Sequence, residues 1–290
     1  MIISRYLTGL DEQTMSKGIV IFAYNSKLDY VSIATIAAQL AKKHLGLPVT
    51  LITDTEEVDY DVFDNVIIQQ SNSRGQRVFK FANRTERTVW HNQNRSNAYE
   101  LSPYDQTLLI DADYLIFNNS LAKLFDTNLE FACYDRVHEL SGWTSLQNGA
   151  RVGDPGIHMQ WATVVYFTKC ELAENVFGFM QTIKENYGYY SGLYNFSMEL
   201  FRNDYTLSIA LQVLTGYNQN NFTQIPGTLI SANTPVEIAE ARPNGEVVLT
   251  WTESNGKKKV TKVTNTNIHI MNKDSIINPV ILSQLRELAQ

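Results

Sequence analysis

Apolar and polar residues follow one another along the first part of the chain in the order of a strand, a helix and a second strand. The run from Ile19 to Ala23 has no polar interruption, which is typical of a strand buried on both faces of a sheet. The next segment repeats apolar residues at helical spacing, and a capping glycine and a proline follow them: Ile33, Ile36, Ala37, Leu40, Gly46 and Pro48. "PVTLITD" then predicts a strand that ends at Asp54. A unit of this length favours a right-handed crossover between parallel strands.

Further apolar runs continue the pattern to the end of the chain. Strands are predicted in "DNVIIQQ", "TLLIDADYLIF", "LEFACYD" and "QWATVVYFTK", and helices in "RSNAYELS", "KCELAENVFGFMQTIKENYGYY" and "DYTLSIALQVLTGY". Asn255 and Gly256 lie between two alternating runs and predict a hairpin. We expect an α/β fold with a mixed, mainly parallel sheet flanked by helices and a C-terminal β-hairpin. No repeat or linker divides the chain, so residues 1–290 are expected to form one domain.

Composition narrows the class of protein. Of the 290 residues, 44% are hydrophobic and 19% are charged, as in soluble globular proteins. No apolar stretch approaches the roughly 18 residues that span a membrane, and the N-terminus lacks the apolar region of a signal peptide, so we expect a cytoplasmic protein. The formal net charge of -6 argues against a general nucleic-acid coat. Cys133 and Cys170 stand in apolar segments without metal-ligand spacing and are expected to be reduced core residues.

Two acids interrupt the apolar run "TLLIDADYLIF". In an extended segment Asp111 and Asp113 share a face, and the small Ala112 between them leaves the neighbouring space open. Two carboxylates aimed at one point suit a hard divalent cation such as Mg²⁺ or Mn²⁺, which also binds phosphates. The alternative is a strand-to-loop exit in which Asp113 accepts hydrogen bonds from backbone amides.

A histidine and a lysine near the C-terminus are candidates to complete that site. His269 and Lys273 are four residues apart in "NIHIMNK", so a tight turn would let the imidazole reach the cation and the ammonium reach a phosphate. The alternative is an ordinary strand histidine and a solvated loop lysine. In parallel sheets ligands bind beyond the carboxyl ends of the strands, where Asn25, Asp54 and Asp111 are predicted to lie.

The order of these motifs resembles the nucleotide-sugar-dependent glycosyltransferases of the GT-A fold, in the neighbourhood of glycogenin-like enzymes. The resemblance covers most of the chain, from "GIVIFAYN" to "IHIMNK". Within that family, "IVIFAYN", "LPVTLITD", "AYELSPYDQTLLIDADYLI" and "NIHIMNKD" are similar to glycosyltransferase-like proteins of T4-type tailed phages. The resemblance implies a GT-A (Rossmann-like) fold with a nucleotide-binding half at about 18–115 and an acceptor half at about 116–290.

The resemblance also implies a UDP-sugar donor, Mn²⁺ or Mg²⁺, and a set of site residues. Asp111 would contact the ribose and the metal, Asp113 and His269 would be direct metal ligands, and Lys273 would hold the diphosphate. Base and ribose contacts would come from the ends of the first two strands, and a basic contact with the diphosphate or donor sugar from the helix ahead of the strand that carries the two aspartates: Ala23, Tyr24, Asn25, Asp54 and Arg95. Tyr24 would stack on the uracil ring.

The chain departs from the family at two places. "HIMNK" is shorter than the family's motif and lacks its glycine, which affects the lysine assignment. The helix "RNDYTLS" carries Asp204 alone where the family has paired acids, and a helix N-cap is the alternative for this residue. For an inverting reaction Asp204 and Asp154 are the candidates to take the acceptor proton, whereas a retaining reaction needs no base at that place.

The acceptor is predicted from the basic aromatic segment Arg74 to Arg95. Positive charges interleaved with flat side chains suit a phosphodiester backbone and an extruded base, and "GKKK" at 256–259 is a second candidate phosphate contact or a solubilising turn. Some phages of the similar kind place glucose or arabinose on 5-hydroxymethylcytosine, so the resemblance implies a DNA acceptor, in the host cytoplasm if the chain is phage-encoded. The sequence predicts no oligomeric state.

Other function classes remain open. The acceptor could be a glycan or a protein, or the chain could be a noncatalytic module that binds nucleotide sugars or nucleic acid. A nucleotidyltransferase is disfavoured, because "FAYNSKLDY" lacks the glycine-rich basic loop that such enzymes carry after the first strand.

Overall fold

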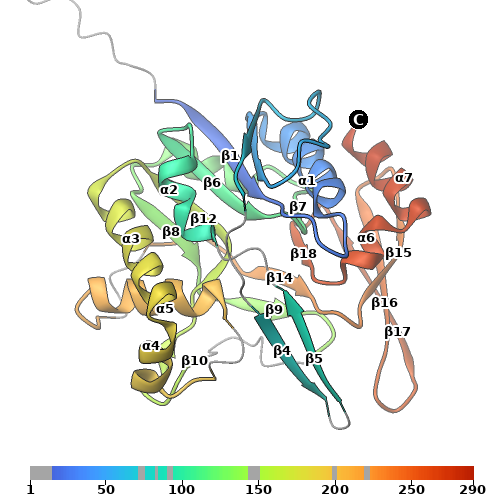
Figure 1. Cartoon of the computed structure of the whole chain (residues 1–290). Helices are drawn as coiled ribbons and strands as arrows, with labels where there is room; N and C mark the ends of the chain where they lie inside the picture. The colour runs from blue at the N-terminus through green and yellow to red at the C-terminus, as the bar shows by residue number, and fades with distance from the viewer. Residues whose placement is uncertain are drawn as a thin grey trace, which may run out of the picture.

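A seven-stranded sheet forms the centre of the molecule (Figure 1). The structure is a computed structural model that describes residues 15–70, 76–81, 84–89, 94–142, 151–197, 201–218 and 223–290. The strands of the central sheet, in spatial order, are β13 (Thr223–Gln224), β8 (Phe131–Tyr134), β12 (Trp161–Thr168), β6 (Gln106–Asp111), β1 (Lys17–Phe22), β2 (Val49–Thr53) and β3 (Asn65–Ile68).

The central sheet is mainly parallel, as the apolar runs predict. β3, β2, β1 and β6 pair in parallel, β12 runs antiparallel to both of its neighbours, and β13 pairs in parallel with β8. Ile19, Val20 and Ile21 in β1 have no exposed surface, which explains why no polar position interrupts that strand.

Helices pack on the sheet in two groups (Figure 1). α1 (Tyr30–Leu45), α6 (Lys273–Ile277) and α7 (Pro279–Ala289) pack together beside β1 and β2, whereas α3 (Glu171–Glu185) and α5 (Asn203–Leu214) pack on each other and α5 packs on β12. The predicted C-terminal end of α1 is confirmed, since Gly46 ends the helix with a φ of 65°; Asp29 caps its first turn. The expected α/β class with a helix-flanked, mainly parallel sheet is therefore correct.

A second sheet of four strands brings distant parts of the chain together. Its order is β7 (Tyr114–Leu115), β18 (Ile268–Ile270), β14 (Leu229–Ala232) and β9 (Val137–Glu139). β18 is antiparallel to β7 and parallel to β14. This pairing places the late "NIHIMNK" segment directly beside the end of the "TLLIDADYLIF" run.

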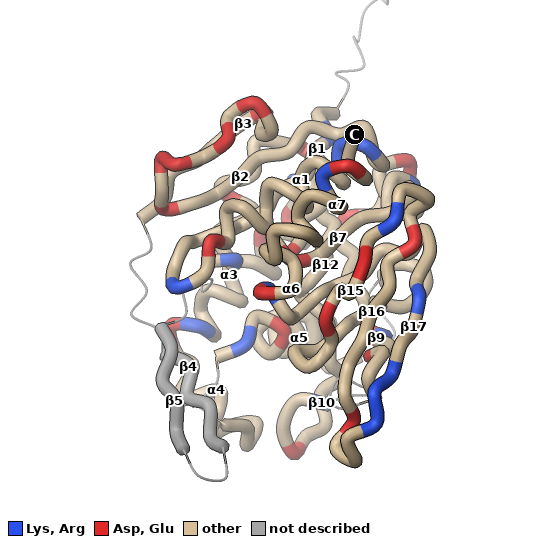
Figure 2. Tube along the Cα trace, turned by 90° about the vertical axis from the view of Figure 1, so that its right-hand side faces the viewer, with Lys and Arg blue, Asp and Glu red and all other residues tan. Residues whose placement is uncertain are grey.

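The predicted C-terminal hairpin is present and belongs to a three-stranded antiparallel sheet (Figure 2). Its strands are β15 (Glu237–Ala241), β16 (Glu246–Thr252) and β17 (Lys258–Thr264). The β16–β17 turn is longer than the two-residue turn that Asn-Gly favours: Glu253 pairs with Lys257, and Gly256 adopts a φ of 81°.

The remaining elements are short or lie at the edges. The basic aromatic segment Arg74 to Arg95 holds a two-stranded hairpin, and the helix predicted in "RSNAYELS" is split into a 3-10 turn and one α-turn. These elements are β4 (Gln76–Phe81), β5 (Arg84–Val89), η1 (Asn94–Asn97), α2 (Ala98–Leu101), η2 (Ser120–Asp126), β10 (Arg151–Val152), β11 (Ile157–His158) and α4 (Tyr187–Tyr194). Cys133 is buried and Cys170 is partly buried, and both are free thiols, as predicted. Among the described residues, no helix is long and apolar enough to cross a membrane.

A substitution at Gly18 tests the packing around β1. A Cβ on this glycine would lie 2.3 Å from the Tyr104 ring, whose hydroxyl also bonds the buried Thr50 side chain at 2.9 Å. Gly18→Ala should therefore lower the free energy of unfolding by about 1–3 kcal/mol, measured by urea denaturation. Gly178→Ala, in open space on α3, is the matched control and should raise stability by up to about 1 kcal/mol. Equal stabilities for Gly18→Ala and the wild type would contradict this account of the packing.

Candidate functional site

The carboxyl ends of three parallel strands meet at one edge of the central sheet. The backbone N–H of Asn25, which follows β1, donates to Asp54 Oδ1 at 3.1 Å, so the ends of β1 and β2 are joined by a side chain. The Asn25 side chain in turn accepts from the Val31 amide at the start of α1, at 3.1 Å. Ala23 lies just before this pair and is buried. The structure therefore brings Ala23, Asn25 and Asp54 together, as the sequence predicts.

The burial of Tyr24 differs from what stacking on a uracil ring would require. Its side chain is buried, with 3% of the residue exposed, and its hydroxyl donates to Gln69 Oε1 at 2.9 Å. Burial raises the pKa of this tyrosine to about 12. The ring offers no open face on which a base could stack in this conformation.

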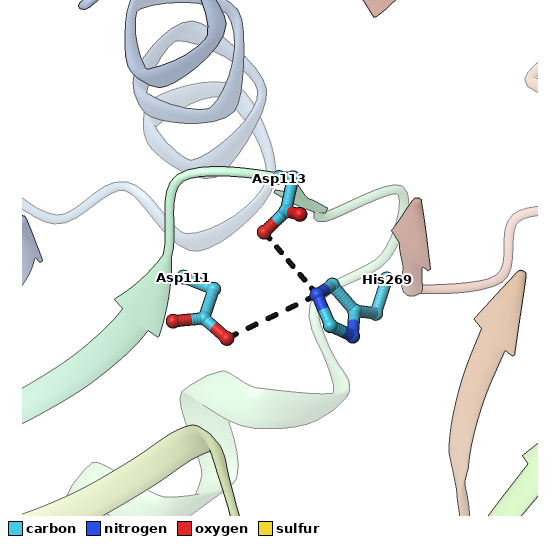
Figure 3. A group of neighbouring side chains, drawn as sticks. All are labelled: Asp111, Asp113 and His269. Atoms are coloured by element: carbon cyan, nitrogen blue, oxygen red, sulfur yellow. Dashed lines mark ion pairs between the residues drawn. The ribbon is translucent and has the colours of Figure 1, made fainter. Parts of the chain in front are cut away.

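Asp111, Asp113 and His269 form a cluster at the end of β6 (Figure 3). Asp113 Oδ1 lies 3.2 Å from His269 Nε2, and Asp111 Oδ2 lies 3.9 Å from the same nitrogen. The three ligand atoms are all within 4.8 Å of one another. His269 is held in place by the pairing of β18 with β7 and by the Ile270 amide, which donates to the Asp113 carbonyl at 2.9 Å.

A positively charged side chain pairs with the second oxygen of each carboxylate. Arg95 Nη1 lies 2.6 Å from Asp111 Oδ1, and Lys273 Nζ lies 2.5 Å from Asp113 Oδ2. Arg95 is 1% exposed and also donates to the Thr163 carbonyl at 3.2 Å, so its direction is fixed. Each aspartate therefore has one oxygen held by a cation and the other turned toward His269.

Burial and neighbouring charges act differently on the cluster residues. Burial raises the pKa of Asp111, and the Asp113 and Asp204 carboxylates add to the rise against the effect of Arg95. Burial also opposes ionisation of Asp113, but Lys273 and His269 outweigh it and hold its pKa well below the usual value. His269 has a raised pKa, because the two aspartates outweigh the effect of burial. Asp113 is thus an anion at neutral pH.

The donor set fits a hard divalent cation. Two carboxylate oxygens and one imidazole nitrogen are ligand types that Mn²⁺ accepts, and the cluster leaves the remaining coordination positions to other donors. The charges of Arg95 and Lys273 cancel those of Asp111 and Asp113, so a bound divalent ion would give the site a net charge of about +2. Such a site favours an anionic ligand.

The two candidate proton acceptors occupy different places. Asp204 Oδ1 accepts from the Ala162 amide at 2.9 Å and Oδ2 accepts from Arg202 at 2.8 Å. Asp204 is not the N-cap of α5, a position that Arg202 takes without a side-chain hydrogen bond. Asp154 lies exposed on the turn between β10 and β11, and the Asn195 side chain donates to it at 2.5 Å. Of the two, Asp204 is the one whose charge acts on Asp111.

Sequence reasoning missed a row of polar side chains on the second sheet. Tyr114, His269, Ser231 and Glu139 are register partners on adjacent strands, so their side chains point to the same face as the metal-ligand candidate. Ser231 and Glu139 are both buried. Glu139 Oε1 accepts from Ser141 at 2.7 Å and from the Asn233 amide at 3.1 Å. Glu139 ends β9, and a strand of three residues is too short to show a period in the sequence.

Most side chains of the predicted acceptor segment lie outside what the structure describes. Arg74, Trp90 and His91 are not described, and of the stretch between them the structure describes only the backbone of β4 and β5. The last residue of that segment, Arg95, belongs instead to the aspartate cluster.

Comparisons with known proteins give structural neighbours and no sequence match. No protein-family model and no curated protein matches the chain. Among solved structures, the chain is similar to the glycosyltransferase GlyE of Streptococcus pneumoniae TIGR4, with 14% identity over 73% of this chain and 45% of that one and a TM-score of 0.42. The chain thus spans less than half the length of GlyE.

Two further neighbours are also glycosyltransferases. The galactosyltransferase LgtC, solved with donor and acceptor sugar analogs, shares 13% identity over 67% of this chain and 70% of that one, with a TM-score of 0.42. Mouse xyloside xylosyltransferase 1 shares 9% identity over 68% and 82%, with a TM-score of 0.40. At these identities and TM-scores an activity has to be argued from the site itself.

The pKa values of His269 and His44 should be shifted in opposite directions from the ordinary value, measured in one NMR pH titration of chelator-treated protein. The pKa of His269 should lie above the ordinary 6.5 because of the aspartates, whereas burial and Lys43 hold that of His44 below it. Protonated His269 therefore stabilises the fold at low pH, and this contribution is lost as pH rises through the folded-state pKa. Asp113→Asn should lower the pKa of His269 and leave His44 unchanged. A His269 pKa at or below the ordinary value in the wild type would contradict the cluster geometry.

Proposed function

We propose that the protein is a metal-dependent glycosyltransferase of the GT-A type that transfers a sugar from a UDP-sugar to an acceptor hydroxyl. One observation carries the proposal: Asp111 and Asp113 each have one oxygen held by a cation and the other turned toward His269, at the edge where parallel strands end. The order of the sequence motifs supports the same assignment.

The charge of the site supports a diphosphate leaving group. Asp111, Asp113 and His269 would hold Mn²⁺ or Mg²⁺, which when bound neutralises the diphosphate oxygens. Lys273 Nζ has three donors, of which one faces Asp113 and one the Met271 carbonyl at 3.1 Å, so the third can bind a phosphate oxygen. Arg95 is buried behind Asp111, and we assign it to orienting that ligand in place of the predicted sugar contact.

The nucleoside would lie over the ends of β1 and β2. Asp54 and the backbone around Ala23 and Asn25 are the base and ribose contacts that we propose, because these groups meet at the edge that also carries Asp111. Tyr24 would support the proposed nucleoside site from the protein interior, since its ring is buried.

Transfer breaks the bond between the anomeric carbon and the diphosphate oxygen and forms a bond from that carbon to the acceptor oxygen. The diphosphate leaves with the bonding electron pair, and Lys273 would stabilise its charge. The acceptor proton must pass to a base. Asp204 and Asp154 remain the proposed candidates for an inverting reaction, although both oxygens of Asp204 already accept hydrogen bonds.

Mn²⁺-dependent release of UDP is the direct test of the enzyme proposal. The wild type, incubated with UDP-glucose, UDP-galactose and UDP-arabinose, should hydrolyse at least one donor slowly without an acceptor. Asp113→Asn should reduce that rate by about 10²-fold or more, because the charge that holds the cation is lost. Asp126→Asn, at an exposed carboxylate, is the control and should behave as the wild type. Absence of both UDP release and Mn²⁺-dependent UDP binding would refute the proposal that the protein is an enzyme.

The acceptor that we propose is 5-hydroxymethylcytosine in DNA, with glucosyl or arabinosyl transfer. Within the described residues, support comes from the lysines of the β16–β17 hairpin, which line β17 in Figure 2. Lys259 and Lys262 are offset by Glu253 and Glu246, so Lys257 and Lys258 supply the net charge near the tip. A phosphodiester backbone would bind such a charge in a salt-dependent way.

Mass spectrometry of DNA tests this acceptor. With Mn²⁺ and the active UDP-sugar, hydroxymethylcytosine DNA should gain one sugar mass per modified base, and unmodified DNA of the same sequence should gain none. The double substitution Lys257→Ser and Lys258→Ser should weaken transfer to DNA at 50 mM salt more than at 200 mM salt, because fewer phosphate contacts give a shallower salt dependence. Mass gained only by a glycan or a protein would refute the DNA acceptor, and UDP-sugar binding without any transfer would favour a noncatalytic binding module.

A further inference from the structure

Strand β12 is irregular where it passes the aspartate cluster. Val164 to Thr168 pair in regular antiparallel register with β6. On the other side, Val165 pairs with Cys133, but the next partners are Trp161 and Tyr134, so the register with β8 shifts. Such a bulge takes backbone groups out of the ladder, and these groups need other hydrogen-bond partners.

Two side chains of the site neighbourhood bind the backbone of this bulge. The Ala162 amide donates to Asp204 Oδ1 at 2.9 Å, and the Thr163 carbonyl accepts from Arg95 Nη2 at 3.2 Å. Asp204 and Arg95 thus bind adjacent residues of the same irregular segment. The other terminal nitrogen of Arg95 contacts Asp111 Oδ1 at 2.6 Å. A continuous chain of hydrogen bonds therefore runs from Asp204 through the bulge to Asp111.

Arg202 anchors the far end of this chain. Its Nε and Nη2 atoms both donate to Asp204 Oδ2, at 3.2 and 2.8 Å, while Oδ1 accepts from the Ala162 amide, so the carboxylate is held at both of its oxygens. The guanidinium carbon lies 5.2 Å from the centre of the Tyr205 ring and 6.0 Å from that of Trp161. Trp161 is itself the first residue of β12, so Arg202 contacts the bulged strand both directly and through Asp204.

We propose that Arg202 is a positioning residue for Asp111. By holding Asp204 against the bulge of β12, Arg202 fixes the Thr163 carbonyl, which directs Arg95 and so turns the free oxygen of Asp111 toward His269. This inference rests on the proposed function only in taking Asp111 as a metal ligand. It gives Asp204 an orienting role in place of the candidate base role above, which agrees with the engagement of both of its oxygens.

The sign of one effect separates positioning from simple electrostatics. Arg202→Met removes a positive charge and leaves Asp204 unpaired, so electrostatics alone would make the neighbourhood more negative and tighten cation binding. Loss of positioning has the opposite effect, because a loosened bulge releases Arg95 and lets Asp111 turn away. Outer partners of metal ligands typically change metal affinity by about 10- to 100-fold.

Mn²⁺ titration by calorimetry measures this sign. Arg202→Met should weaken Mn²⁺ binding about tenfold, the size found for outer partners of metal ligands, and Arg202→Lys, which keeps the charge and one hydrogen bond, should recover part of that loss. Arg242→Met is the matched control: it removes an arginine paired with Glu240 and Glu246 on the C-terminal sheet and should bind Mn²⁺ as the wild type does. The double variant Arg202→Met with Asp204→Asn should lose no more affinity than the worse single variant, because both substitutions break the same chain.

A stability cycle tests the same chain without metal. Arg95 binds Thr163 of the bulge, whereas Arg202 binds Asp204, which accepts from Ala162 of the bulge. The two arginines bind different partners, so Arg202→Lys and Arg95→Lys would act independently if the bulge did not couple them. We expect the unfolding constant of the double variant to differ by at least about threefold from the value that adding the single effects predicts.

The outcomes separate the two proposals. Wild-type or tighter Mn²⁺ binding by Arg202→Met, while Asp113→Asn still abolishes binding, overturns the positioning role and leaves the proposed function intact. If the wild type binds no Mn²⁺, the proposed function fails and the stability cycle decides the positioning role alone. Additive effects in that cycle overturn it.

Discussion

Two carboxylates turned toward one imidazole repel each other, and the surrounding structure offsets that repulsion with two cations. Arg95 and Lys273 each take one oxygen of one aspartate, so the charges cancel pairwise while one oxygen of each acid remains directed at His269. Removal of either cation would leave a largely buried carboxylate without its partner, which is strongly destabilising. The geometry of the rest of the site depends on these two ion pairs staying in place.

Arg95 and Lys273 reach the aspartates through different structural elements. Lys273 follows β18 directly, so the strand pairing that places His269 also places the lysine. Arg95 comes from a 3-10 turn ahead of β6, and it is held by the Thr163 carbonyl on the bulge of β12. The irregularity in an otherwise regular strand thus has a physical function, because a carbonyl released from the ladder can accept from the arginine instead of a strand partner.

The sequence indicates the pair of aspartates, and it also indicates that they lie at the end of a strand. Apolar runs that end abruptly at Asn25, Asp54 and Asp111 predict strand ends, and parallel pairing then places these ends at one edge, as the structure has them. The C-terminal hairpin was likewise readable from its alternation. By contrast, the burial of Tyr24 follows from the side chains around it, and no local pattern in "FAYN" reports how deeply a strand end is covered.

The sequence by itself determined the strand order within the first parallel unit, the type of fold and the chemical identity of the cluster, because hydrophobic periodicity and side-chain type are local properties. Only the tertiary structure decided which oxygen of each aspartate is occupied, that Asp204 is engaged by Arg202, and that Ser231 and Glu139 share a face with His269. These features depend on contacts between segments far apart in the chain and on strands of two to four residues, which are too short to carry a period of their own.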